Sequence, residues 1–150
     1  MTLSVSTAPA IVRGVNTVNL GLNGLAPVAF LVLRCWVAWQ FMKSGLTKIQ
    51  SFSTTIDLFR YEYHVPILPP EVATYLATGA ELGCSALLMV GLAGRVNALA
   101  LFILNIVAVL SYADALLQDH LPWGLILLVF VLHGPDKLSL DHLIGRYLNR

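Results

Sequence analysis

Two ionisable residues lie inside long apolar stretches of this sequence, where a charge is energetically costly. Arg34 lies within AFLVLRCWVAWQFM, and Glu81 lies within VATYLATGAELGCSALLMVGL. A charged side chain at the centre of a bilayer costs at least about 2.5–3.5 kcal/mol, so each of these residues needs a partner or a function. Counting along the two predicted helices places Arg34 about 17 Å and Glu81 about 14 Å from the same membrane face. The sequence therefore predicts an ion pair between them across adjacent helices.

Other polar residues extend this pair into a predicted seam inside a helix bundle. Lys48 shares a helical stripe with Arg34, and Asn105 and Tyr112 share a stripe on a later helix. Three interpretations stay open: a structural ion pair that fixes the helix register, a site for a ligand, a proton or a quinone, and a wrong estimate of the depth of these residues. In the first two, the residues lie together inside the bundle. In the second interpretation the candidate cofactor-binding residues are Arg34, Lys48, Glu81, Asn105 and Tyr112.

The cysteines and histidines form no catalytic or metal-binding pattern. Cys35 and Cys84 both lie in apolar stretches and do not form a CxxC motif, so they suit small packing residues better than a redox pair. None of the four histidines has the spacing typical of metal ligands. A phosphate-binding loop and a serine-nucleophile elbow are also absent from the sequence. The sequence therefore predicts no metal site and identifies no catalytic residue.

The helices that carry these residues are predicted to lie in a membrane. Hydrophobic residues make up 57% of the 150 residues, charged residues only 11%, and the mean hydropathy is +0.77. A soluble domain carries roughly 25% charged residues. So small a globule cannot bury this apolar excess, and lipid is its expected solvent. The net charge is +1 and there is no basic run, so nothing in the sequence indicates nucleic-acid binding and no nucleic-acid partner is expected.

Four apolar windows are long enough, or nearly so, to cross the ~30 Å of bilayer hydrocarbon. They are Ala26 to Gly45, Val72 to Leu92, Val96 to Leu117 and Leu121 to Gly134. The fourth is short enough to be a re-entrant or buried helix, although an even number of helices with short connections favours a span. The predicted fold is therefore all-α, a single domain over residues 1–150 that forms an integral membrane bundle of four transmembrane helices.

The segments outside these windows suit the membrane boundary. Residues 49–70, between the first and second helices, are amphipathic, and Tyr61 and Tyr63 are typical of the lipid–water interface. The turn at Gly94-Arg95 is very tight, so the second and third helices are expected to pack as an antiparallel hairpin. The C-terminal KLSLDHLIGRYLNR alternates apolar with charged residues, which predicts a short surface helix.

Positive charges near the helix ends predict the orientation in the membrane. One side would carry Arg13, Arg95, Lys137, Arg146 and Arg150. The other side would carry Lys43, Lys48 and Arg60. Both termini are therefore expected in the cytoplasm. The first apolar run continues past any plausible cleavage point, so we expect a retained span rather than a signal peptide.

Four segments, in order, resemble the DoxX family of bacterial integral membrane proteins. They are LRCWVAWQFMKSGLTKI, TTIDLFRYEYHVPILPPEVA, ATGAELGCSALLMVGLAGR and GPDKLSLD. Each segment alone is a loose match, but four in the correct order between Leu33 and Asp141 are fairly specific. The sequence departs from the family pattern at Asp136, where glycine is more usual.

The resemblance implies a four-helix protein of the bacterial inner membrane. The family is named from a relative that resembles the membrane subunit of a thiosulfate:quinone oxidoreductase, and other members are linked with oxidative-stress complexes. The matching positions are Arg34, Gly45, Lys48, Glu81 and Arg95. The resemblance favours a membrane component or anchor of a redox-associated system that binds a protein partner.

Other functions and assemblies remain open. One is a quinone-reactive oxidoreductase subunit with a buried Arg-Glu site, for which a quinone is the cofactor considered. Another is a small-solute transporter, which the absence of an inverted repeat disfavours. A homo-oligomer also stays open. Neither an enzymatic reaction nor a substrate follows from the sequence.

Overall fold

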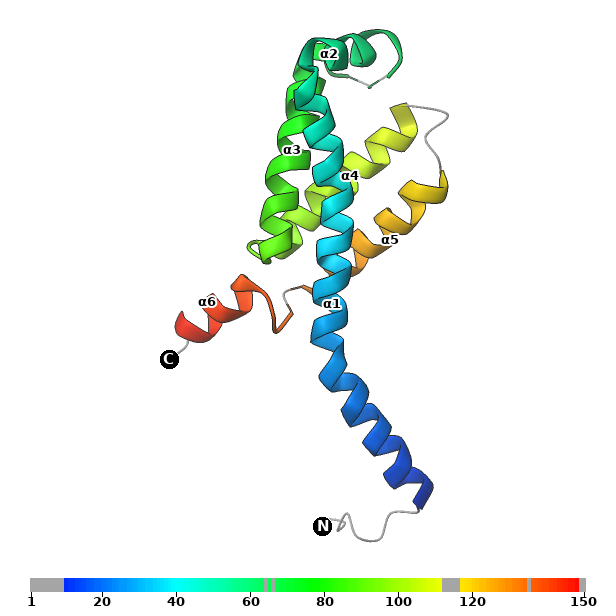
Figure 1. Cartoon of the computed structure of the whole chain (residues 1–150), viewed down its shortest axis with the longest axis vertical. Helices are drawn as coiled ribbons and strands as arrows, with labels where there is room; N and C mark the ends of the chain where they lie inside the picture. The colour runs from blue at the N-terminus through cyan, green and yellow to red at the C-terminus, as the bar shows by residue number, and fades with distance from the viewer. Residues whose placement is uncertain (1–9, 64, 66, 112–116, 135, 149–150) are drawn as a thin grey trace.

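The structure of the protein, a computed structural model, describes residues 10–63, 65, 67–111, 117–134 and 136–148. Within these ranges it contains helices and no β-strand (Figure 1). The helices are α1 (Ala10–Gln50), α2 (Phe52–Tyr61), α3 (Pro70–Val90), α4 (Gly94–Ser111), α5 (Leu117–His133) and α6 (Leu140–Leu148). The predicted all-α class is confirmed for this part of the chain.

Three helices in the described ranges are long and apolar enough to cross a membrane. They are α1, over Gly14–Gln50, together with α3 and α4. The fourth predicted span corresponds to α5, which has 17 residues and therefore a length of about 26 Å. Its first turn also carries the polar residues Asp119 and His120. The structure thus supports three spanning helices, and α5 falls short of the same length.

Helix α1 is much longer than the predicted window from Ala26 to Gly45. Its 41 residues extend for about 60 Å, twice the thickness of the hydrocarbon layer. The first half extends away from the other helices (Figure 1), and its apolar residues Val15, Val18 and Leu22 are exposed. Only the second half packs in the body of the molecule, so this half is the part that positions polar groups.

The helices pack in a closed order around an apolar core. Helix α1 packs on α3, α3 on α4, α4 on α5, and α5 returns to α1. The buried apolar cluster consists of Val37, Ala38, Phe41, Leu88, Ala98, Leu101, Leu127 and Phe130. The predicted hairpin of α3 and α4 is confirmed, but its turn lies at residues 91–93, where Gly91 adopts a φ of 73°, and the predicted turn residues Gly94 and Arg95 are the first two of α4.

Helix α2 and the segment after it lie across one end of the molecule, which we call the α2 end (Figure 1). Phe59 of α2 packs with Ala73 and Ala77 of α3, while Tyr61 is exposed. Helix α3 begins at Pro70, a residue whose fixed φ suits the first turn of a helix. The predicted amphipathic segment therefore forms a helix with one buried face. The opposite end, which carries α6, we call the α6 end.

Candidate ligand-binding cavity

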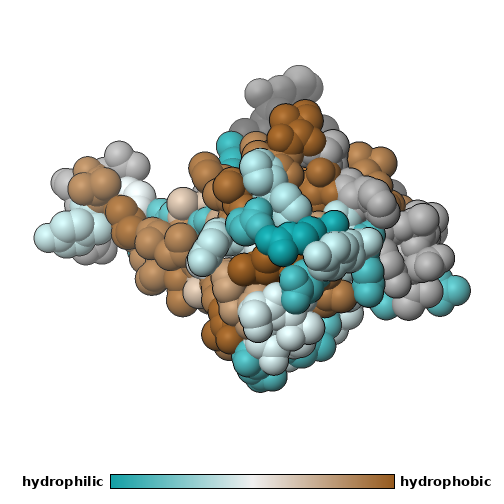
Figure 2. Space-filling model, turned by 90° about the horizontal axis from the view of Figure 1, so that it is seen from above, coloured by the Kyte–Doolittle hydropathy of each residue, from teal (hydrophilic) through white to brown (hydrophobic). Residues whose placement is uncertain are grey.

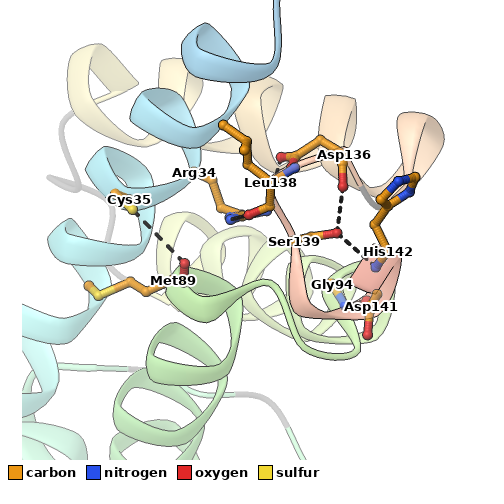
Figure 3. Close-up of polar contacts among 9 residues, drawn as sticks. All are labelled: Arg34, Cys35, Met89, Gly94, Asp136, Leu138, Ser139, Asp141 and His142. Atoms are coloured by element: carbon orange, nitrogen blue, oxygen red, sulfur yellow. Dashed lines mark hydrogen bonds and ion pairs between the residues drawn. The ribbon is translucent and has the colours of Figure 1, made fainter. Parts of the chain in front are cut away.

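The predicted pairing of Arg34 with Glu81 is wrong, because Arg34 binds Asp136 at the α6 end (Figure 3). Its Nη1 donates to Asp136 Oδ2 at 2.9 Å, and its Nη2 donates to the carbonyl oxygen of Leu138 at 3.0 Å. Both side chains of this ion pair are 4% exposed. Asp136 Oδ1 also accepts a hydrogen bond from the backbone nitrogen of Leu138, at 2.8 Å. The segment between α5 and α6 therefore supplies acceptors for both Nη atoms of Arg34, while its buried Nε atom has no hydrogen-bond partner among the described residues.

The register of α1 against α3 explains this difference. The sequence-based estimate placed the membrane face at Gly45 and counted the depth of Arg34 from there, but α1 continues to Gln50. A Cβ atom on Gly45 would lie 3.1 Å from the Cβ atom of Glu81, so these two positions are level. Because the helices are antiparallel, Arg34 lies level with the end of α3, roughly 16 Å beyond Glu81.

Glu81 instead pairs with Lys48. The Nζ atom of Lys48 donates to both carboxylate oxygens of Glu81, at 2.7 and 2.8 Å. Ser44 links the two groups, since its hydroxyl accepts a hydrogen bond from Lys48 at 2.7 Å and donates one to Glu81 at 3.2 Å. The Glu81 side chain is 8% exposed and that of Lys48 is 18% exposed. This charged group joins α1 and α3 near the α2 end.

Local sequence explains why these side chains meet. Ser44 and Lys48 are four residues apart, so they lie on the same face of α1. Gly45 next to them has no side chain, and a Cβ atom there would approach Leu82 Cδ2 to 2.8 Å. Small residues of this kind allow close approach of membrane helices. The close approach brings the ammonium group of Lys48 within bonding distance of Glu81.

Asn105 makes a second polar link, between α4 and the first turn of α5. Its Nδ2 atom donates to the carbonyl oxygen of His120 at 2.9 Å, and its Oδ1 atom lies 2.8 Å from His120 Nδ1. Because Nδ2 is used as the donor, Oδ1 must accept the hydrogen bond from the ring. The neutral imidazole therefore carries its proton on Nδ1 and presents the lone pair of Nε2 as an acceptor.

A cavity of about 330 Å³ lies between these two polar links. It is within the size range of small-molecule sites. Its polar lining residues are Ser44, Lys48, Tyr63, Glu81, Ser111, Asp119 and His120. Its apolar lining residues are Phe59, Val65, Ala77, Leu104, Val107, Ala108 and Trp123. Seen from the α2 end, hydrophilic residues gather at the middle of the face, with hydrophobic residues around them (Figure 2).

The Ser111 hydroxyl is a distinctive feature of this cavity. Ser111 is the last residue of α4 and is 6% exposed, and its Oγ atom has no hydrogen-bond partner among the residues that the structure describes. A buried hydroxyl without a partner destabilises the folded protein by about 1–3 kcal/mol. A ligand that bonds to this hydroxyl would remove that cost.

The predicted site residues thus belong to different places in the structure. Lys48 and Glu81 line the cavity, and Asn105 holds His120 in its wall. Arg34 belongs to the α6 end. Tyr112, together with Asp114 beside it, lies outside the described residues.

Sequence reasoning missed several members of the site. Ser44 is an ordinary serine on a helix, and its signal was the four-residue spacing to Lys48. His120 lacks the spacing of a metal ligand, so the sequence did not identify it as a site residue. Its signal was its position next to Asp119, directly before an apolar window. Asp136 was noted only as a departure from a family pattern, although a buried arginine requires an acidic partner. Among the described residues, no group of three His, Cys, Asp or Glu side chains is arranged to hold a metal ion.

The α6 end also gathers several residues that carried the family resemblance. Asp141 accepts hydrogen bonds from the backbone nitrogens of Ala93 and Gly94, both at 2.8 Å. Gly91, at positive φ, leaves room for Arg34, since a Cβ atom there would lie 2.8 Å from its Nη1 atom. These contacts tie the segment after α5 to the turn between α3 and α4. These contacts give the group, which we call the α6-end cluster, a structural role. The cavity beside it has only about 10 Å³, which is too small for a ligand site.

A mainly apolar buried layer separates the cavity from the α6-end cluster. On α1, Val37 and Phe41 lie between Arg34 and Ser44, and neither is more than 4% exposed. Leu88, Leu101 and Leu127 occupy the corresponding levels of α3, α4 and α5 and are fully buried. The cavity is therefore confined to the part of the molecule near the α2 end.

Comparison with known proteins agrees with the sequence resemblance. Residues 29–114 match the DoxX family, a range that includes the packed half of α1, all of α3 and all of α4. An uncharacterized protein of Haemophilus influenzae is 35% identical over 130 residues, which cover 79% of this chain and 85% of that protein. No solved structure matches the chain. With its three apolar helices of spanning length, this chain is a multi-pass membrane protein that belongs to the DoxX family.

Proposed function

We propose that this protein is a membrane component of a redox-associated system, and that its cavity binds a small ring-shaped ligand with polar substituents, such as a quinone. The observation that carries the proposal is the cavity near the α2 end, in which a buried ion pair faces aromatic side chains and an unpartnered hydroxyl. Ligand sites are typically apolar cavities with a few convergent polar groups, and this cavity has that character.

The chain's own residues suit the substituents of such a ring. The Ser111 hydroxyl is able to donate to a carbonyl oxygen, and Nε2 of His120 is an acceptor for a ligand hydroxyl. Trp123 packs against the His120 ring, with 5.0 Å between the two ring centroids, and offers an aromatic wall. When bound, a quinone would supply two-electron redox chemistry. The residues would bind and orient it, while the electron donor or acceptor would be a partner protein.

The membrane arrangement forms part of the proposal. We place α5 across the bilayer as a fourth span, which completes a four-helix bundle in the bacterial inner membrane with both termini in the cytoplasm. Support comes from the packing of α5 on α4 and α1, and from the buried side chains Leu127 and Phe130 on its inner face. The exposed side chains of Leu125, Val129 and Leu132 on the same helix are suited to lipid.

A second candidate function is an anchor for a partner protein or for further copies of this chain. It is favoured by the exposed first half of α1, which extends beyond the other helices (Figure 1). A transporter is disfavoured, because the described side chains buried between the cavity and the α6 end are mainly apolar.

The test compares two serine variants. Wild-type protein, Ser111→Ala and Ser85→Ala would be purified from the native membrane in mild detergent, and bound small molecules and proteins would be identified by mass spectrometry. Ser85 is the matched control, because its hydroxyl is also buried without a partner but does not line the cavity. Both variants should be at least as stable as the wild type, since each removes an unsatisfied hydroxyl.

We expect a quinone or a related ring compound to accompany the wild type and Ser85→Ala, and to be depleted at least about tenfold in Ser111→Ala, which corresponds to the loss of ~1.4 kcal/mol. A redox enzyme that co-purifies with all three would support the redox association. A wild-type protein that carries no small molecule and binds no added quinone would contradict the ligand proposal. Co-purification of a partner protein in that case would favour the anchor.

A further inference from the structure

A groove of about 330 Å³ lies between α4 and α5, on the other side of the link between Asn105 and His120. From α4 it is lined by Phe102, Asn105, Ile106, Val109 and Leu110, and from α5 by His120, Leu121, Gly124, Leu125 and Leu128. Apart from Asn105 and His120, every side chain in this lining is apolar. The groove therefore suits hydrocarbon rather than a polar molecule.

Position and exposure place the groove against lipid. Helix α4 is one of the spanning helices, and its residues Ile106 and Leu110 are 42% and 72% exposed. Leu125, opposite them on α5, is 56% exposed. The lining spans nine residues of α4, from Phe102 to Leu110, so the groove is about 12 Å long. This length accommodates a linear chain of several carbon–carbon bonds.

The groove and the cavity share one residue, His120. Gly124 helps to form the junction, because a Cβ atom there would lie 3.0 Å from Asn105 Nδ2. The absence of a side chain at Gly124 thus allows Asn105 to reach His120 across the two helices. One side of the His120 residue faces the polar cavity and another faces the apolar groove.

We propose that the groove holds the hydrocarbon chain of a membrane-borne ligand whose polar ring lies in the cavity, with His120 at the junction of ring and chain. The proposal rests on the proposed function, since it gives the ring-binding cavity an attached site for a tail. It also defines the class of ligand, an amphipathic molecule with a polar ring and a linear apolar chain. Such a ligand would enter sideways from the bilayer, between α4 and α5.

The test uses a photoreactive probe in lipid nanodiscs that contain the full chain. The probe is a dimethoxy-methyl-benzoquinone ring that carries a ten-carbon chain with a terminal diazirine. The same chain on a phosphatidylcholine serves as the comparison for ordinary lipid contact. Labelled positions are mapped by mass spectrometry, with and without an excess of the same ring lacking its chain.

We expect the quinone probe to label the groove-lining residues at least about fivefold more than the phospholipid probe does, because ring binding holds the chain in place. Excess of the chainless ring should reduce this labelling. Equal, uncompeted labelling by both probes would show that the groove holds only ordinary acyl chains, and would overturn the inference.

A separate binding measurement with the chainless ring distinguishes the two proposals. If the chainless ring binds but the groove is not labelled, the tail site is wrong and the cavity proposal stands. If neither the chainless ring nor the chain-bearing probe binds, the cavity proposal fails and the inference fails with it.

A pair of variants tests the groove directly. Ile106→Phe with Leu125→Phe would fill the groove from both walls and should abolish groove labelling, while the chainless ring still binds as in the wild type. The matched control is Leu99→Phe with Leu132→Phe, on the same two helices and exposed to lipid outside the groove. The control should keep the labelling. Labelling that persists in the filled groove would contradict the proposal.

Discussion

At the scale of single residues, the ion pair of Lys48 and Glu81 is the charged part of the cavity. Both side chains are mostly withdrawn from solvent, so removal of one partner leaves the other without compensation. Such a loss costs about 3–5 kcal/mol in a buried pair, whereas replacement of both partners by neutral groups is often tolerated.

The single variants Lys48→Met and Glu81→Gln should therefore each lower the thermal stability of the purified protein. The double variant should recover a large part of the loss. Lys43→Met is the control, because Lys43 is exposed and forms no ion pair within the described residues. Thermal unfolding in detergent measures these effects. Single variants as stable as the control would show that the pair contributes nothing to folding.

Arg34 and Asp136 form the other buried ion pair, which holds the segment after α5 in place. The change Asp136→Ala would remove the acceptors for Arg34 Nη1 and for the backbone nitrogen of Leu138. We expect a loss of stability of about 3–5 kcal/mol, and faster proteolysis of α6. Lys137→Ala, an exposed neighbour, is the control. An unchanged rate of α6 cleavage in Asp136→Ala would contradict the structural role of this pair.

The sequence was informative about the types of these residues but not about their pairing. Arg34 and Glu81 were identified because a charge in an apolar helix requires a partner, and each has one. The pairing depended on where α1 ends, and an apolar window does not show where a helix continues into polar residues. Helix α1 ends five residues, or about one and a half helical turns, beyond the predicted window, and this error contributed to the wrong choice of partners for both residues.

At the scale of helices, the close approach of α1 and α3 depends on Gly45. A side chain at this position would meet Leu82 Cδ2 at 2.8 Å, and the two helices would have to separate. The change Gly45→Val should destabilise the protein by about 1–3 kcal/mol and weaken the link between Lys48 and Glu81. Gly83→Val is the control, because a Cβ atom on Gly83 meets nothing within 4 Å. Equal stability of the two variants in thermal unfolding would contradict this packing role.

The transmembrane placement of α5 is open to a direct topological test. In a chain with Cys35 and Cys84 replaced by alanine, single cysteines would be placed at two exposed positions, Asp119 in the first turn of α5 and Lys137 beyond its last turn. If α5 crosses the bilayer, a membrane-impermeant thiol reagent should label Asp119→Cys from the periplasm and Lys137→Cys only after the cytoplasmic side is opened. Labelling of both from one side would show a re-entrant helix, and labelling of Asp119→Cys only from the cytoplasm would reverse the orientation.

Helix class and helix order could be predicted because apolar windows separated by turn residues are a strong signal. The exposed first half of α1 was not predicted, since GVNTVNLGLNGL is only weakly apolar and contains three asparagines. The cavity could not be predicted either, because it is lined from five segments distant in the chain. A cavity forms where side chains from different helices leave space unfilled, and the periodicity of apolar residues in the sequence does not show where that happens.

At the scale of the whole molecule, polar groups gather at two ends, and a mainly apolar buried layer lies between them. The α6 end is held by Arg34 and its partners, and a mainly apolar layer follows, whose buried side chains include that of Ser85. Near the α2 end, the helices enclose space around the ion pair of Lys48 and Glu81. The chain of 150 residues thus combines a closely packed α6 end with a cavity near the α2 end.

The most direct test of this account is to fill the cavity without changing its charged groups. Ala108→Phe would place a ring into the space between α4 and the ion pair, and Ala100→Phe, on the same helix outside the lining, is the matched control. Quinone retained by each purified variant would be measured by mass spectrometry, with thermal unfolding as a check on folding. We predict that Ala108→Phe folds but loses the bound ring compound, while Ala100→Phe keeps it. Equal retention by two folded variants would contradict the claim that this cavity is the ligand site.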